Sequence, residues 1–298
     1  MNDTPRIDAH QHYWHPARGD YFWMPQGDET LDRRYGPDHL TPLLAAHDIS
    51  GTVLVQAAPS VEETEYLLGI ADATPSVLGV VGWVDFEDRG HARQLERLKA
   101  HPKFRGVRPM IQDIPDVDWM LREDIAWAFD ALSDLDLSFD ALGFTRHLKN
   151  FLTVLTRHPK LRVVIDHCMK PPIHAHPDGF AEWAEGMRAL AEQTAARCKL
   201  SGLVTEAGLI WDRDDLEPYA ALVLEAFGPE RVMWGSDWPV CRLRAEYDEW
   251  LAAAEALCAP LDAAGRAAVF GGTAAAFYRL EPAAAAGSDG ASAGGRAG

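Results

Sequence analysis

Short apolar runs recur along the chain and alternate with longer segments in which apolar positions follow a helical period. The runs are nearly continuous in Val, Ile and Leu, as expected of strands that are buried on both faces. We expect eight strands, over Arg6–Ala9, Gly51–Ala57, Val77–Val84, Arg105–Ile111, Leu135–Leu142, Leu161–Asp166, Cys198–Leu203 and Arg231–Gly235.

The segments between these runs predict helices. The helical pattern covers Val61–Ala73, Ala92–Ala100, Trp119–Ser133, Thr145–Arg157, Ala181–Ala195, Leu216–Phe227 and Ala245–Leu257. One strand follows the previous one after about 30 residues, the size of a βα unit. The alternation indicates an α/β fold, either a parallel barrel or a doubly wound sheet. No GxGxxG or P-loop sequence follows any of the strands, which argues against a nucleotide site on the sheet.

The 298 residues suit a single domain of this kind over residues 1–280. Within it, Ala263–Leu280 is expected to form a closing helix and a short end. Residues 281–298 are rich in Ala, Gly and Ser, cannot form a core, and are predicted to be a disordered tail.

The charge and the cysteine pattern limit the binding partners and the cellular compartment that we expect. A net charge of −17, from 28 basic and 45 acidic residues, argues against nucleic acid and anionic lipid as partners. No apolar run reaches the roughly 18 residues that span a bilayer, and the start of the chain lacks the features of a signal peptide. The four cysteines have no CxxC spacing, so we expect reduced thiols in a cytoplasmic protein, with Cys168 and Cys241 as apolar fillers.

Candidate chemistry first appears at the end of the first strand, where the sequence reads Asp8-Ala9-His10-Gln11-His12. Residues i and i+2 of a strand point the same way, so both imidazoles can face one point. Imidazole is a good ligand for a divalent transition metal. An HxH pair is a weak motif by itself, because two histidines at a strand end can also be satisfied by loop contacts.

Two later groups strengthen this reading. His167 follows VVID at the end of the sixth strand, and Asp237 follows VMWGS at the end of the eighth. In a parallel barrel these strand ends share one face, where active sites form. Three histidines and one aspartate on that face predict either a mononuclear metal shell or an acid–base cluster.

Three more polar side chains are candidates for the same face. Arg108 lies on the fourth strand, Asp140 in the fifth, and Lys170 follows the sixth. Each has an ordinary alternative: Arg108 could pair with a neighbouring carboxylate, and Lys170 could be solvated.

Aromatic side chains and further histidines offer weaker signals. Trp14 and Trp211 lie near predicted strand ends, where flat rings could stack on a sugar, although packing explains them equally well. His174 and His176 form a second HxH pair in a proline-flanked loop and are interpreted as loop residues. His15 is three residues from His12 and is expected to face away from the site.

Several segments together resemble the sugar-lactone hydrolases of the amidohydrolase superfamily, and most closely the L-fuconolactonase type. These segments are IDAHQHYWHPARGDYFWM, VIDHCMKPP, CKLSGLVTEAG, RVMWGSDWPVC and VFGGTAAAFYRL. The resemblance runs from about Arg6 to Leu280 and implies an amidohydrolase-type (β/α)8 TIM barrel.

The resemblance also implies a reaction and roles. It implies hydrolysis of a sugar lactone, as in L-fucose catabolism, with Asp237 as general acid and base, assisted by His167 and Arg108. His10, His12, His167 and Asp237 would surround one zinc-like ion or no ion at all. Trp14, Asp140, Lys170 and Trp211 are the expected substrate contacts.

The chain departs from the family pattern at some positions. The family's binuclear relatives carry a bridging lysine on a mid-barrel strand, and no such lysine is found here, since the fifth strand carries Asp140. The family usually has Asp in place of His15 and Leu-Gly in place of Cys168-Met169. These differences leave the four-residue centre intact and bear on the choice of substrate.

Two rival functions remain open at this point. One is a metal-dependent, non-oxidative decarboxylase on the same scaffold, and the other is a non-catalytic barrel that binds a metal or a sugar. The sequence does not predict sugar stereochemistry, lactone ring size or oligomeric state.

Overall fold

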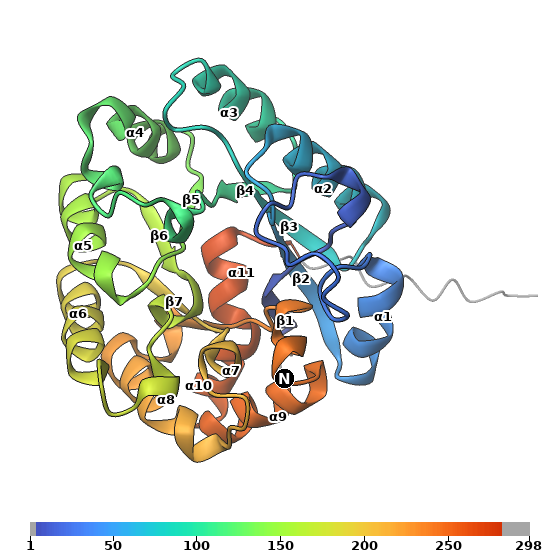
Figure 1. Cartoon of the computed structure of the whole chain (residues 1–298), viewed down its shortest axis with the longest axis vertical. Coiled ribbons are helices and arrows are strands. Elements are labelled where there is room, and N and C mark those ends of the chain that lie inside the picture. Colours follow the sequence, from blue (N-terminus) through green and yellow to red (C-terminus); the bar gives the residue numbers. More distant parts are fainter. Residues whose placement is uncertain (1–3, 282–298) are drawn as a thin grey trace, which may run out of the picture.

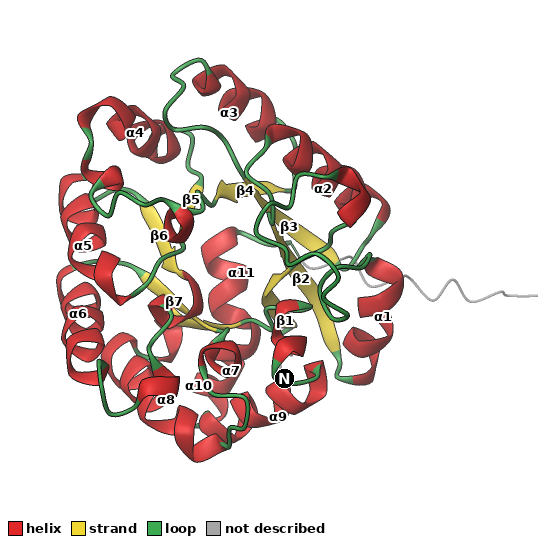
Figure 2. Cartoon of the chain, viewed as in Figure 1, coloured by secondary structure: helices red, strands yellow, loops and turns green. Residues whose placement is uncertain are grey.

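Eight parallel strands in sequential order form the centre of the computed structural model, which describes residues 4–281 (Figures 1 and 2). The strands are β1 (Arg6–Gln11), β2 (Ile49–Val55), β3 (Val77–Gly82), β4 (Phe104–Val107), β5 (Ser138–Ala141), β6 (Arg162–Ile165), β7 (Arg197–Leu200) and β8 (Val232–Trp234). Between β5 and β6 the register is regular, with Ser138–Ala141 opposite Arg162–Ile165. The ladder from β1 to β2 is interrupted by register shifts.

Helices surround the strands (Figure 2). They are α1 (Pro37–Ala46), α2 (Val61–Ala73), α3 (His91–Lys99), α4 (Ala126–Asp134), α5 (Leu148–Arg157), α6 (Phe180–Gln193), α7 (Leu203–Glu206), α8 (Arg213–Phe227), α9 (Tyr247–Leu257), α10 (Ala263–Ala267) and α11 (Thr273–Tyr278). Most of the core lies between these helices and the outer face of the strands. Within residues 4–281, no helix has the length and apolar character needed to cross a membrane.

The barrel closes through the ends of β1 and β8. The amide of His12 donates to the carbonyl of Trp238 at 2.7 Å, and the amide of Asp237 donates to the carbonyl of His10 at 2.8 Å. These bonds join the first strand to the segment that follows the last one. The predicted (β/α)8 barrel is confirmed, and its closure already places Asp237 beside the two histidines.

Helix α11 covers the end of the barrel at which the strands begin. In Figure 1 it crosses the middle of the ring of strands. Phe277 and Tyr278 pack with apolar side chains from β1, β2, β3, β6 and β8. The Phe277 carbonyl accepts a hydrogen bond from Arg162, at the start of β6, at 2.7 Å. The barrel is therefore plugged at its amino-terminal end and open to ligands only at the carboxyl ends of its strands.

Some elements differ from the sequence-based expectations. Helices α1 and α7 lie outside the predicted helices; in α1, Pro37 occupies the first turn, where no amide donor is needed. The expected single closing helix is broken into α10, a π turn (Ala268–Gly272) and α11. A Cβ atom at Gly271 would lie 1.9 Å from the Pro5 carbonyl oxygen, so the break lets the chain pass close to the start of β1. The predicted tail beyond residue 281 lies outside the described residues.

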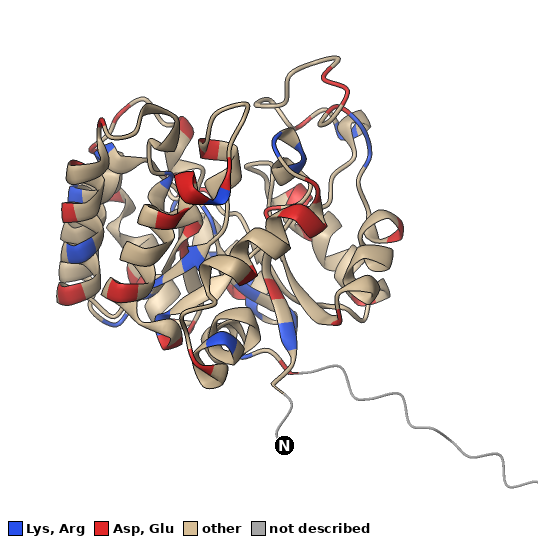
Figure 3. Cartoon of the chain, turned by 90° about the horizontal axis from the view of Figure 1, so that it is seen from below, with Lys and Arg blue, Asp and Glu red and all other residues tan. Residues whose placement is uncertain are grey.

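Charged side chains are spread over the outer helices, with acidic and basic residues interspersed (Figure 3). Many form pairs near the surface, such as Arg34 with Asp38 and Arg242 with Glu246. Such exposed pairs contribute little to stability, on the order of 0–1 kcal/mol each.

Candidate active site

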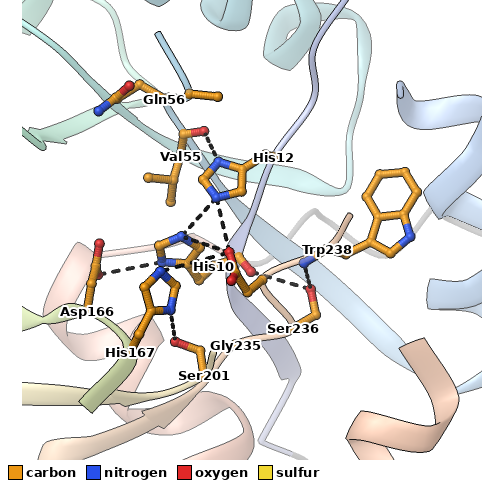
Figure 4. A network of polar contacts seen from close by, with 12 residues as sticks. His10, His12, Val55, Gln56, Asp166, His167, Ser201, Gly235, Ser236 and Trp238 are labelled. Carbon is orange, nitrogen blue, oxygen red and sulfur yellow. Dashed lines mark hydrogen bonds and ion pairs between the residues drawn. The ribbon is translucent and has the colours of Figure 1, made fainter. Parts of the chain in front are cut away.

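Four predicted groups meet at the carboxyl end of the barrel (Figure 4). One oxygen of Asp237, Oδ1, lies 3.2 Å from Nε2 of His12, 3.7 Å from Nε2 of His10 and 3.9 Å from Nε2 of His167. All four side chains are almost completely buried. Sequence elements more than 200 residues apart thus converge on a single carboxylate oxygen.

Asp8 holds the two strand ends in register beneath this cluster. Its Oδ1 accepts hydrogen bonds from the amide of His10 at 3.1 Å and from the amide of Ser236 at 2.9 Å. Tyr247 donates to the other oxygen at 3.3 Å. Burial raises the pKa of Asp8 to about 6, against the hydrogen bonds that it accepts. Asp8 is a positioning group, since it fixes the backbone on either side of the site.

His167 is presented by an unusual turn after β6. Residues His167, Cys168, Met169 and Lys170 all have positive φ, from 46° to 58°. The left-handed conformation costs non-glycine residues about 1–2 kcal/mol each. A hydrogen bond from Trp183 to the Cys168 carbonyl at 2.7 Å helps hold this turn. Strain that is retained in this way is typical of functional sites, and here it directs both His167 and Lys170 toward the cavity.

The electrostatic setting keeps Asp237 ionised. Burial alone would raise the pKa of this carboxyl, but the neighbouring imidazoles, His167 above all, hold it well below its ordinary value. Burial lowers the pKa of His167 to about 4 and also lowers that of His12. At neutral pH the site therefore offers a carboxylate beside neutral imidazoles, the protonation state that a general base requires.

A cavity of about 260 Å³ opens above the cluster. Its lining includes the expected residues Trp14, Arg108 and Lys170. The remaining lining residues are His12, Trp23, Pro25, Leu31, Ala57, Met110, Gln112, Leu142, His167, Asp237, Val240 and Leu243. The volume is just below the roughly 300–1,000 Å³ that is usual for drug-sized ligands, so it suits a single small ring.

Some predicted residues lie elsewhere. Asp140 is fully buried under the site, where it accepts hydrogen bonds from Lys199 and Tyr278, both at 2.6 Å, and it does not line the cavity. Trp211 is half-buried outside the cavity and donates to the Arg244 carbonyl at 2.9 Å. In this structure neither side chain can reach a ligand in the cavity.

The histidines that were set aside are away from the centre. His174 and His176 are exposed on their loop. His15 is also exposed, and its Nδ1 accepts a hydrogen bond from the Ala17 amide at 3.2 Å.

The sequence reading missed Lys199, which lies on β7 and is completely buried. Its Nζ lies 2.6 Å from Asp140, 2.9 Å from Asp166 and 3.0 Å from Nδ1 of His10. A signal was present, because a lysine inside an otherwise apolar buried strand needs a partner in the barrel. The partners themselves lie on or directly after other strands, so the sequence of this strand does not identify them.

The donor set is of the kind that holds zinc. The ligand atoms of His10, His12 and Asp237 lie within 4.8 Å of one another. A carbonyl can only accept, so Nδ1–H of His12 donates to Val55 at 2.8 Å and the neutral ring keeps a lone pair on Nε2. This second hydrogen bond is the usual support of a metal-ligating histidine. Imidazole and carboxylate together suit a single divalent ion.

Comparison with known proteins agrees with this geometry. Residues 7–280 match the amidohydrolase family model. The chain is 46% identical to an L-fucono-1,5-lactonase of Burkholderia ambifaria over 283 residues, covering 93% of this chain and 97% of the relative. It is 38% identical to an L-fucono-1,5-lactonase of Burkholderia multivorans, at 93% and 97% coverage.

Solved structures show the same architecture. A zinc-bound crystal structure of a Burkholderia multivorans amidohydrolase superposes with a TM-score of 0.89, at 38% identity, and covers 93% of this chain and 100% of that one. The family model and these relatives together show that the chain belongs to the amidohydrolase family.

Proposed function

We propose that this protein hydrolyses a neutral sugar lactone, L-fuconolactone or a close deoxy or pentono analogue, to the open-chain aldonic acid. The observation that carries the proposal is the Asp237 oxygen, at the cavity, held within 3.9 Å of three imidazole nitrogens. The two Burkholderia relatives named as L-fucono-1,5-lactonases support the choice of substrate.

In the proposed reaction, ionised Asp237 accepts a proton from a water molecule as that water attacks the lactone carbonyl. The carbonyl oxygen becomes negatively charged, and Arg108 and His167, which line the cavity, supply positive charge and a hydrogen-bond donor to it. The C–O bond to the ring oxygen then breaks, and Asp237 returns its proton to that oxygen. The products are a carboxylic acid and a hydroxyl group on one chain.

A divalent ion fits the same residues. His10, His12 and Asp237 would hold it, with His167 beside them, and it would polarise the lactone carbonyl as a Lewis acid. We propose at most one such ion. The protein's own residues supply the base, the proton return and the substrate pocket.

The cations around the cavity favour a neutral substrate. One Arg108 nitrogen donates to the Gln56 carbonyl, and the other lies 3.5 Å from Asp166. Nζ of Lys170 lies 3.9 Å from the Glu206 carboxylate. Each of these two cations already has a carboxylate neighbour, so the cavity offers less positive charge to a substrate carboxylate than two unpaired cations would.

This pairing weighs against the decarboxylase alternative, whose aromatic acid would need an unpaired cation for its carboxylate. The two alternatives also release different products. Decarboxylation releases carbon dioxide, whereas lactone hydrolysis releases only acid.

A pH-indicator assay over a panel of aldonolactones, with and without a chelator, tests the proposal. We expect one equivalent of acid per lactone opened, no carbon dioxide, and fastest turnover with L-fuconolactone or a near analogue. Tight binding of lactones without turnover would instead support a non-catalytic sugar-binding barrel.

A further inference from the structure

Lys199 lies inside the barrel beneath the active-site cluster and contacts it through His10. Its side chain is completely buried inside the barrel, between carboxylates on two other strand ends. Asp140 lies 2.6 Å from Nζ and Asp166 lies 2.9 Å from it, so both carboxylates compensate an ammonium group. The third contact of Nζ is Nδ1 of His10, at 3.0 Å.

We infer that Lys199 fixes the tautomer of His10, so that this histidine presents an Nε2–H group to His12 and Asp237. An ammonium group has hydrogens to donate and no lone pair. Nδ1 of His10 must therefore accept from it. A neutral imidazole carries one hydrogen, which is then on Nε2.

Two weaker contacts compete with this arrangement. Nδ1 of His10 also lies 3.5 Å from Asp166, which would favour a hydrogen on Nδ1. Nε2 lies 3.4 Å from Arg108, which would favour a lone pair on Nε2. Both distances are at the limit of a hydrogen bond, whereas the Lys199 contact has the ordinary length.

The consequence for the proposed reaction is that His10 becomes a donor within the cluster. Its Nε2–H lies 3.1 Å from Nε2 of His12, which has a free lone pair because Nδ1 of His12 donates to Val55. The same hydrogen faces Asp237 at 3.7 Å. Lys199 is thus a positioning residue. The role of Lys199 in catalysis rests on the proposed lactone hydrolysis. The tautomer of His10 does not depend on that proposal.

The same contact has a consequence for metal binding. A ligating histidine usually donates its second ring N–H to a carboxylate, a carbonyl or water. His12 does so, but His10 faces an ammonium group instead. Lys199 therefore weakens the share of His10 in holding a divalent ion.

The test compares four forms of the full-length protein: wild type, Lys199→Met, Asp140→Asn, and the double variant Lys199→Met/Asp140→Asn. Lys199→Met alone leaves two buried carboxylates without their cation and is expected to be unstable. The double variant keeps the net charge of the wild type, and Asp140→Asn alone keeps the contact with His10. Thermal unfolding identifies the folded forms.

The first readout is the ring-nitrogen NMR spectrum of ¹⁵N-histidine-labelled protein, with the His10 signals assigned by their loss in His10→Gln. We expect Nε2–H in the wild type and in Asp140→Asn, and Nδ1–H donated to Asp166 in the double variant. The second readout is zinc titration of the same proteins. A hydrogen bond from a charged donor is among the stronger ones, so the double variant should bind zinc about tenfold more tightly or better.

Finding His10 of the wild type in the Nδ1–H form would overturn the inference, and this result needs no variant to fold. A folded double variant that keeps the Nε2–H form and the wild-type zinc affinity would overturn it as well. If no lactone is hydrolysed but His10 carries its hydrogen on Nε2, the proposed function fails and the inference stands. Where lactones are hydrolysed, kcat should fall in the double variant with KM nearly unchanged.

Discussion

Asp237 combines near-complete burial with a depressed pKa. Burial would favour the neutral acid, but His167 and His12 reverse that preference. The result is a buried carboxylate that stays ionised well below neutral pH. A base held in this way can remove a proton from water and, once protonated, is a strong acid toward the departing ring oxygen.

Replacing Asp237 with Asn should keep the shape of the site and remove the base. General acid–base catalysis is worth roughly 10²–10⁴-fold, so we expect kcat to fall at least about a hundredfold with the fold intact. Steady-state kinetics and a circular dichroism spectrum measure both parts. A folded Asp237→Asn protein that retains more than a tenth of the wild-type kcat would remove this residue from the mechanism.

Helix α2 supports one wall of the cavity through the buried side chain of Glu63. At the start of α2, Glu63 is completely buried and its Oε1 accepts from the Ala57 amide at 2.9 Å. The Ala57 carbonyl in turn accepts from the Trp23 indole at 2.6 Å. Both Ala57 and Trp23 line the cavity. Burial raises the pKa of Glu63 from 4.5 to about 8, so this carboxyl is protonated at neutral pH.

Glu63 should make stability depend on pH. Between about pH 5 and 8 the folded protein keeps the proton of Glu63 and the unfolded chain has released it, so raising the pH favours unfolding. The free energy of unfolding of the wild type should fall by up to about 1.4 kcal/mol per pH unit relative to Glu63→Gln.

Urea unfolding of both proteins at pH 5, 6, 7 and 8 measures this difference. The exposed neighbour Glu62 provides a matched control, because Glu62→Gln should leave the pH dependence unchanged. Parallel curves for the wild type and Glu63→Gln would show that Glu63 is ionised in the folded state throughout this range.

The loop after β7 supports His167 from behind. Gly202 has φ of +68°, and a Cβ atom there would lie 2.8 Å from the His167 ring. Gly202→Ala should therefore displace His167 and also cost about 1–2 kcal/mol for the left-handed backbone. We expect kcat to fall roughly tenfold, since small displacements of reacting groups are costly.

Gly208 in the same connection is the control, because a Cβ atom there would lie 3.4 Å from the nearest other atom, an ordinary contact distance. Gly208→Ala should leave kcat and the free energy of unfolding close to those of the wild type. Equal kcat values for the two variants would mean that the position of His167 is not important for turnover.

Local pattern was enough to predict the strands and the four-residue centre. Buried parallel strands have a strong apolar signal, and His10, His12, His167 and Asp237 lie at the carboxyl ends of such strands or within three residues of them. What could not be predicted depends on contacts across the barrel. Asp140 looked like a cavity residue, but its carboxylate points to Lys199 and Tyr278. Only the closed barrel brings Lys199 of β7 next to His10 of β1.

The whole barrel determines which molecules can enter. Helix α11 closes one end, and the cavity at the other end holds cations that already have carboxylate neighbours. The acidic surface, with a net charge of −17, adds no attraction for anions. We therefore expect both features to favour a neutral lactone over a carboxylated one.

The most direct test is therefore a comparison of kcat/KM for L-fuconolactone and for 2-pyrone-4,6-dicarboxylate under identical conditions. A buried carboxylate without a free cation costs several kcal/mol, so the neutral lactone should be favoured by at least about a hundredfold. Turnover of the dicarboxylate at a rate equal to or above that of every neutral aldonolactone in the panel would contradict the proposed function.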